Sequence, residues 1–168
     1  MERSPSSFAI TLFVALRALL FGGLFLGFWF FAALLTHRLD RLWNLALPQW
    51  TALPGIILLA LGAAVSLPCV VVFIGRGRGT PAPFDPPQKF VATGLYRYCR
   101  NPMYVGLLLM LGGLALIWQS PAVIILAALL AVAIHSAVVA LEEPQLKRRF
   151  GQPYLDYCGR VPRWLPRI

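Results

Sequence analysis

The sequence predicts an all-α integral membrane protein with about four transmembrane helices. Hydrophobic residues make up 59% of the chain and the mean hydropathy is +0.73, whereas soluble domains are roughly 45–50% apolar. Only 12% of the residues are charged, against about 25% in an average soluble domain. The apolar residues also gather in four stretches without Lys, Arg, Asp or Glu. In a chain of 168 residues, four such stretches leave room for little besides membrane helices.

The four apolar stretches are residues 18–35, 52–74, 103–118 and 121–141. A membrane span needs about 20 residues, within a range of about 17–25, so the first, second and fourth are long enough and the third is short. Because Gln119, Ser120 and Pro121 predict a tight turn, we expect a helical hairpin over residues 102–141, with its first arm shielded by protein. Residues 18–35 are long and lack a following small-residue cleavage site, so we interpret them as a mature helix, not a signal peptide.

The distribution of positive charge predicts the orientation in the membrane. With four spans, the N-terminus, residues 75–101 and the C-terminal tail share one side, which holds 13 of the 15 Lys and Arg residues. Arg38 and Arg41 lie on the other side. The positive-inside rule then places both termini in the cytoplasm, and we expect the bacterial inner membrane. The net charge of +9 follows from this asymmetry and favours contact with anionic lipid headgroups. Nothing resembles a nucleic-acid-binding module.

The first long polar segment, residues 75–101, joins the second and third stretches. Three glycines at its start predict a hinge, and four prolines that follow force an extended course. As a nucleotide-binding loop the glycine triplet is a very weak signal, because no strand precedes it. We therefore divide the chain into membrane helices over residues 1–79 and a second region over 80–168, made of the loop 80–101, the hairpin 102–141 and the tail 142–168.

Residues 94–106, with the sequence GLYRYCRNPMYVG, are the most informative part of the chain. Arg97, Arg100 and Asn101 come just before Pro102, which is expected to start the third helix. A helix N-terminus offers free backbone N–H groups and a partial positive charge. Arginines at such a place indicate a site that captures an anionic group.

The C-terminal tail predicts an amphipathic helix on the membrane surface. Leu146, Phe150 and Tyr154 recur at i, i+4 and i+8, while three basic residues face elsewhere. Gly151 is expected to break this helix, and residues 153–157 are expected to form a short turn. Pro162 and Pro166 favour an extended end.

Glu142 and Glu143 form a carboxylate pair at the end of the fourth stretch. Carboxylates at a membrane boundary need partners, so they either pair with Lys147 or Arg148 in the headgroup region or have a functional role. His135 lies two turns deeper on the face of Glu142, where it is either functional or bonded to a backbone carbonyl. The three cysteines lack metal-ligand spacing, so we expect no metal site and assign them as buried or idle thiols.

The motifs taken together resemble the isoprenylcysteine carboxyl methyltransferase family. The pattern is G-x-Y-R-x-x-R-N-P-x-Y-x-G, a short helical hairpin, E-E, and then F-G-x-x-Y-x-x-Y-x-x-x-V-P-x-x-x-P. The related phospholipid methyltransferases share a looser version. The resemblance covers about residues 80–168. It implies an integral membrane methyltransferase that binds S-adenosyl-L-methionine in a cytosol-facing pocket.

The resemblance also implies which residues contact the cofactor. Carried over by position, they are Gln88, Lys89, Phe90, Val91, Gly94, Tyr96, Asn101, Pro102, Met103, Tyr104 and Glu142. The chain departs from the family at two places. Members that act on prenylcysteine have His where this chain has Asn101, and Arg where it has Val138. Asn forms hydrogen bonds but does not titrate, which excludes it as a general base.

The predicted reaction is in-line methyl transfer to a lipophilic or amphiphilic small molecule, lipid or lipidated peptide. A carboxylate acceptor is ionised at pH 7 because its pKa is near ~4, and needs no base. We name Arg100, Asn101 and Glu143 as candidate catalytic residues. Arg100, Arg97 or Arg163 is expected to hold an acceptor anion, whereas an amine acceptor needs a base, for which Glu143 is the candidate. The alternatives are an NADPH-dependent membrane reductase and a non-enzymatic four-helix transporter or scaffold.

Overall fold

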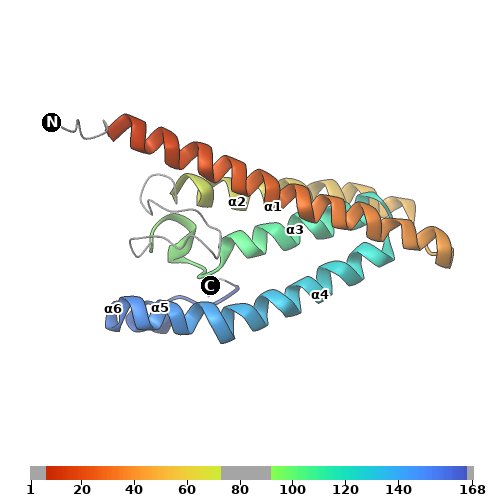
Figure 1. The fold of residues 1–168 in the computed structure, drawn as a ribbon. Helices are drawn as coiled ribbons and strands as arrows, with labels where there is room; N and C mark the ends of the chain where they lie inside the picture. The colour runs from red at the N-terminus through yellow and green to blue at the C-terminus, as the bar shows by residue number, and fades with distance from the viewer. Residues whose placement is uncertain (1–6, 73–91, 166–168) are drawn as a thin grey trace.

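The computed structural model describes residues 7–72 and 92–165, and all secondary-structure elements of this described part are helices. Four apolar helices lie side by side and a compact C-terminal region lies at one end of them (Figure 1). The elements are α1 (Ser7–Trp43), a 3₁₀ turn (Gln49–Thr51), α2 (Ala52–Val72), a second 3₁₀ turn (Gly94–Arg97), α3 (Pro102–Ile117), α4 (Pro121–Ala137), a π-helical turn (Val138–Glu142), α5 (Glu143–Phe150) and α6 (Gln152–Arg160).

Three segments of the described chain are long and apolar enough to cross a membrane, and α3 is shorter. The three are Ala15–Trp43, Gln49–Val72 and Pro121–Phe150, whereas α3 has 16 residues. The predicted all-α membrane fold is thus confirmed. The first span extends well beyond the predicted 18–35, because the polar residues at its C-terminal end continue the helix to Trp43.

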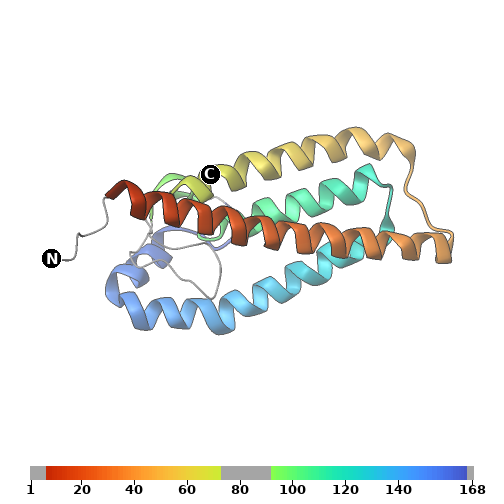
Figure 2. The ribbon, with the colours of Figure 1, turned by 45° about the horizontal axis from the view of Figure 1, so that its top comes forward.

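Helix α3 is shielded by its neighbours, as expected from its short length. None of its residues is exposed, and its closest neighbour is α2, which runs antiparallel to it (Figure 2). Glycines seven residues apart on both helices permit this approach. A Cβ atom added at Gly62 would lie 2.6 Å from the Gly106 carbonyl oxygen, and one added at Gly113 would lie 2.7 Å from that of Gly55. Small residues at such contacts let two membrane helices pack backbone to backbone.

The predicted turn between α3 and α4 is present and is fastened to α1. Gln119 adopts a φ of 55°, and the Ser120 hydroxyl accepts a hydrogen bond from the Val123 N–H at 3.1 Å. The carboxylate of Asp40, on α1, is 4% exposed and accepts hydrogen bonds from the Ala122 N–H at 2.9 Å and from the Ser120 hydroxyl. A carboxylate from a distant helix therefore caps the positive end of α4.

The C-terminal region is more helical than expected. Gly151, with a φ of 59°, separates α5 from α6 as predicted. The prediction of a short turn at residues 153–157 was wrong, because α6 continues to Arg160. Burial of two tyrosines explains the difference. Tyr154 and Tyr157 lie one turn apart on α6 and pack into a cluster with Leu146 and Phe150, which stabilises a helix that local propensity does not favour.

Candidate functional site

The start of α3 lies at the same end of the bundle as α5, α6 and the end of α2 (Figures 1 and 2). Pro102 is the first residue of α3, as predicted, and Asn101 is its N-cap. The Asn101 side chain makes no capping hydrogen bond to the helix. Gly94 opens the preceding 3₁₀ turn with a φ of 61°, a left-handed conformation that glycine adopts at little cost.

Tyr104 and Glu142 meet across α3 and the end of α4. The Tyr104 hydroxyl donates a hydrogen bond to Glu142 Oε1, so the structure brings together two residues that the family resemblance placed in one pocket. Glu142 is the last residue of the π-helical turn. A π turn inserts one residue into a helix and rotates the side chains that follow, and such turns are frequent at functional sites. The next residue, Glu143, begins α5 and has other partners.

Glu143 is held by two guanidinium groups. Arg163 donates to it through Nε at 2.7 Å and through Nη2 at 3.0 Å, and Arg100 donates through Nη1 at 2.9 Å. These partners differ from Lys147 and Arg148, the alternative that the sequence left open, and both of those side chains are exposed on α5. The hydrogen bonds to Glu143 raise the pKa of Arg163. Glu143 thus links two arginines that are 63 residues apart in the chain, one just before α3 and one in the C-terminal tail.

Arg100 is the residue on which these contacts converge. Its side chain is 13% exposed, and its Nη1 group also donates to the Cys158 sulfur at 3.0 Å. Within residues 7–72 and 92–165, the buried Nε–H of Arg100 has no hydrogen-bond partner. A buried donor without a partner is unfavourable, so this group is available to an acceptor other than the described residues.

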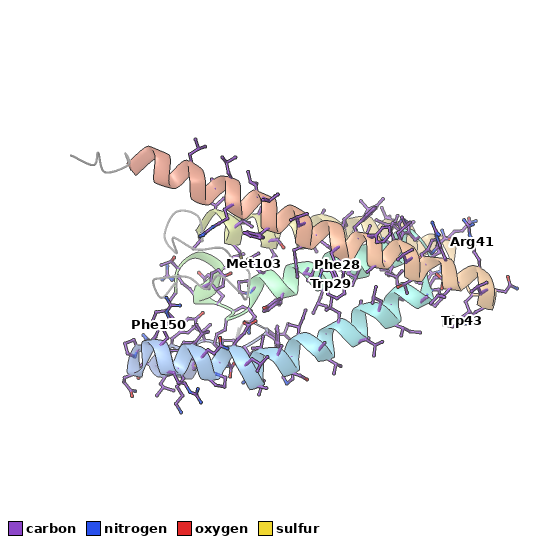
Figure 3. The ribbon with its side chains drawn as sticks, in the orientation of Figure 1. Phe28, Trp29, Arg41, Trp43, Met103 and Phe150 are labelled. Atoms are coloured by element: carbon purple, nitrogen blue, oxygen red, sulfur yellow. The ribbon has the colours of Figure 1, made fainter. Side chains whose placement is uncertain are left out.

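Tyr96 and Met103, two of the predicted cofactor contacts, lie in a separate apolar cluster. They pack with Leu95 and Cys69 of α2, and Tyr96 is 8% exposed. Burial raises the pKa of the Tyr96 phenol. Met103 projects from the start of α3 toward α2 (Figure 3).

The remaining predicted contacts are differently placed. Pro102 is buried and Gly94 is exposed. The predicted contacts Gln88, Lys89, Phe90 and Val91 lie outside the described residues.

The sequence reasoning missed how the C-terminal tail takes part in the site. Asn101 Nδ2 donates to the Arg163 carbonyl at 3.1 Å, and the Cys99 thiol donates to the Trp164 carbonyl at 2.9 Å. His135 Nδ1 accepts from the Trp164 indole N–H at 3.1 Å, so its partner is a side chain instead of a backbone carbonyl. Burial raises the pKa of the Cys99 thiol. A tryptophan in a short proline- and arginine-rich tail was the one local signal for this docking.

The three cysteines are free, as expected. Cys69 and Cys99 are buried and Cys158 is partly buried. In the described part of the chain no group of three or more His, Cys, Asp or Glu residues is placed to hold a metal ion.

Comparison with known proteins gives three curated relatives. The chain is 37% identical over 83 residues to the nickel-cobalt-cadmium resistance protein NccN of Alcaligenes xylosoxydans xylosoxydans, covering 48% of this chain and 37% of that protein. It is 30% identical over 131 residues to the cobalt-zinc-cadmium resistance protein CzcN of Cupriavidus metallidurans, covering 78% of this chain and 55% of that protein. It is 32% identical over 79 residues to protein-S-isoprenylcysteine O-methyltransferase B of Arabidopsis thaliana, covering 47% of this chain and 40% of that protein. The chain thus spans about half the length, or less, of these relatives.

The fold is shared with a solved membrane enzyme. The structure matches that of the eukaryotic intramembrane Ras methyltransferase ICMT (isoprenylcysteine carboxyl methyltransferase) with a TM-score of 0.61 and 19% identity, over 83% of this chain and 51% of that chain. At 19% identity, this similarity shows that the two proteins share a fold. The model of the phospholipid methyltransferase family matches residues 50–153, which is more than half of the chain. The chain therefore belongs to the phospholipid methyltransferase family.

Proposed function

We propose that the protein transfers the methyl group of S-adenosyl-L-methionine to a lipophilic or amphiphilic acceptor at the cytoplasmic face of the membrane. The proposal rests mainly on one observation: Arg100, Glu142 and Glu143 lie together at one end of the apolar helices. These residues belong to two motifs that lie 38 or more residues apart in the chain. The family match and the shared fold support the same activity.

The donor and acceptor groups at this place fit the proposed cofactor. S-adenosylmethionine carries a carboxylate, an amine and ribose hydroxyls, and it supplies a methyl group on a positively charged sulfur. The unpartnered Nε–H of Arg100 and the free N–H groups at the start of α3 suit a carboxylate. Glu142 suits an amine or a hydroxyl. We assign the predicted contacts Gln88–Val91, Gly94, Tyr96, Pro102 and Met103 to the same pocket as part of the proposal.

Each residue of the cluster has a different task in this proposal. The Tyr104 hydroxyl fixes the orientation of the Glu142 carboxylate. Glu143 fixes two guanidinium groups, and a carboxylate that accepts three such hydrogen bonds is a poor proton acceptor. This arrangement favours an acceptor that is already an anion, such as a carboxylate, because methyl transfer to it needs no base. Catalysis then consists of positioning and exclusion of water.

The cofactor assignment is tested by calorimetry on the detergent-purified full chain with S-adenosylhomocysteine, and with NADPH as the comparison ligand. We expect S-adenosylhomocysteine to bind, and Glu142→Gln and Tyr104→Phe to weaken it by roughly tenfold or more, since each removes a charge-assisted hydrogen bond. Matched controls are Asp156→Asn and Tyr98→Phe, which change an exposed carboxylate on α6 and an exposed phenol.

Two outcomes decide against this proposal. Binding of NADPH without binding of S-adenosylhomocysteine would favour the membrane reductase. Equal affinity in the Glu142→Gln variant and the controls would remove Glu142 from the pocket. Membranes incubated with radiolabelled S-adenosylmethionine then identify the acceptor, as the lipid extract or protein band that gains label.

A further inference from the structure

The last described residues are hydrogen-bonded to the residues that come just before α3. We call residues 161–165 the C-terminal strap. The Arg100 N–H donates to the Pro162 carbonyl at 2.9 Å, and the Cys99 thiol donates to the Trp164 carbonyl at 2.9 Å. Val161 is 8% exposed and packs against Tyr157 of α6. The strap is thus attached to the segment just before α3, and to α6.

Asn101 contributes its side chain to the strap instead of to its own helix. As the N-cap of α3 it makes no capping bond, although Asn is among the residues best suited to cap a helix. Its amide donates to the Arg163 carbonyl at 3.1 Å. The side chain of the same Arg163 forms the two-point contact with Glu143. Asn101 therefore fixes the backbone of the residue whose guanidinium completes the cluster.

A second contact fixes the strap from the side of α4. The Trp164 indole N–H donates to His135 Nδ1 at 3.1 Å, with the ring centroids 6.0 Å apart. Trp164 also packs against the core between α3 and α4, where Leu107 and Val138 are buried. Arg163 thus lies between two anchored neighbours: Pro162 bonds to Arg100, and Trp164 bonds to His135.

We infer that Asn101 and His135 are positioning residues that act through the C-terminal strap, by holding Arg163 in place against Glu143. The inference rests on the proposed function, because the cluster that they position is the proposed methyl-transfer site. The physical reason is conformational entropy. Arg163 sits in an irregular segment without helical hydrogen bonds, and a long side chain holds a two-point contact only if its backbone is restrained.

The direct test is limited proteolysis of the full chain in detergent, followed by mass spectrometry. Trypsin cleaves after arginine, and cleavage after Arg163 requires release of the strap. When opening and closing are fast, the cleavage rate follows the fraction of open strap, so each lost hydrogen bond is expected to raise it by roughly two- to tenfold. We expect this rise for Asn101→Leu and His135→Leu. Gln152→Ala and Ser136→Ala are the controls, since the first removes an exposed amide and the second a hydroxyl bonded to its own helix.

Conservative variants separate positioning from general packing. Asn101→His restores an N–H donor and His135→Gln restores an acceptor, so both are expected to return the cleavage rate to near that of the unmodified chain. His135→Leu combined with Trp164→Phe should have the effect of either change alone, because the two residues share one hydrogen bond. In the methyltransferase assay, Asn101→Leu is expected to lower kcat by up to about a hundredfold with a smaller change in KM, as misplacement of a catalytic group does.

The outcomes distinguish this inference from the proposed function. If the rate of cleavage after Arg163 is unchanged in both leucine variants, the inferred role of Asn101 and His135 is wrong. This conclusion does not depend on which ligand the protein binds. An active unmodified protein whose kcat is untouched by Asn101→Leu also contradicts the inferred role. Failure of the unmodified chain to bind S-adenosylhomocysteine instead overturns the proposed function, while the proteolysis result still reports on the strap.

Discussion

Glu142 and Glu143 are adjacent in the sequence, yet they have different partners and different tasks. Glu142 accepts a hydrogen bond from the Tyr104 hydroxyl on α3, and Glu143 accepts hydrogen bonds from two guanidinium groups. Successive residues of a helix point about 100° apart, so one glutamate faces α3 and the other faces the C-terminal strap. A pair that the sequence shows as one acidic motif therefore makes two separate contacts, one at the end of the π-helical turn and one at the start of α5.

Asp40 is a buried carboxylate whose role is structural. It is 4% exposed and lies at the opposite end of the bundle from Glu142, next to Arg41 and Trp43 at the end of α1 (Figure 3). We predict that Asp40→Ala lowers the stability by about 1–3 kcal/mol, because it leaves the buried Ala122 N–H without its acceptor. Asp40→Asn keeps an acceptor oxygen and should therefore lower the stability less. The check is the thermal unfolding midpoint in detergent, and equal midpoints for Asp40→Ala and the unmodified chain would contradict the assigned role.

Helices α2 and α3 form the most closely packed pair among the described elements. Their contact depends on glycine because the neighbours that a Cβ would meet include backbone atoms of the other helix. At Gly62 these are the Gly106 carbonyl oxygen at 2.6 Å and the Met110 nitrogen at 2.7 Å. Backbone atoms of two helices cannot move aside as a flexible side chain does.

We predict opposite results for alanine at two glycines of these helices. Gly62→Ala forces α2 and α3 apart and is expected to cost about 1–3 kcal/mol, as overpacking does. Gly112→Ala meets nothing within 4 Å and is expected to be neutral or stabilising by up to about 1 kcal/mol, because alanine favours a helix over glycine. Thermal unfolding in detergent measures both. A Gly62→Ala variant as stable as Gly112→Ala would show that the contact is not tight.

At the scale of the molecule, all contacts of the candidate site lie at one end of the bundle. The start of α1, the end of α2, the start of α3 and the C-terminal region gather there (Figure 2). Arg41 lies toward the opposite end, near Gln119 in the turn between α3 and α4 (Figure 3), and Arg38 precedes it by one turn of α1. This polarity agrees with the side assignment made from charge, on which the proposed cytoplasmic position of the site rests.

The orientation is tested with a membrane-impermeant thiol reagent on intact cells. We predict that Leu45→Cys, in the exposed connection between α1 and α2, is labelled from outside. Gln152→Cys, at the exposed start of α6, should be labelled only after the membrane is opened. The unmodified chain controls for its three native cysteines. The reverse pattern would place the site outside the cell and exclude a cytoplasmic source of cofactor.

The features that the sequence predicted correctly depend on residues close together in the chain. Runs of apolar residues predicted the membrane helices, Pro102 predicted the start of α3, and Gly151 predicted the break before α6. Local dihedral preferences and hydrophobic length determine such features, whatever the rest of the fold. The resemblance to a family also predicted that Tyr104 and Glu142 line the same pocket. The local sequence around each residue does not predict this proximity.

By itself, then, the sequence determined an all-α membrane protein, and it predicted an anion-binding helix start and a functional carboxylate pair. Only the tertiary structure decided which groups meet. It paired Glu143 with Arg100 and Arg163 instead of Lys147, directed the Asn101 amide to the tail, and brought Asp40 to the start of α4. A hydrogen bond between residues 20 to 82 positions apart leaves no periodic signal in the sequence. It forms because helix packing brings two polar groups together away from water, where each needs a partner.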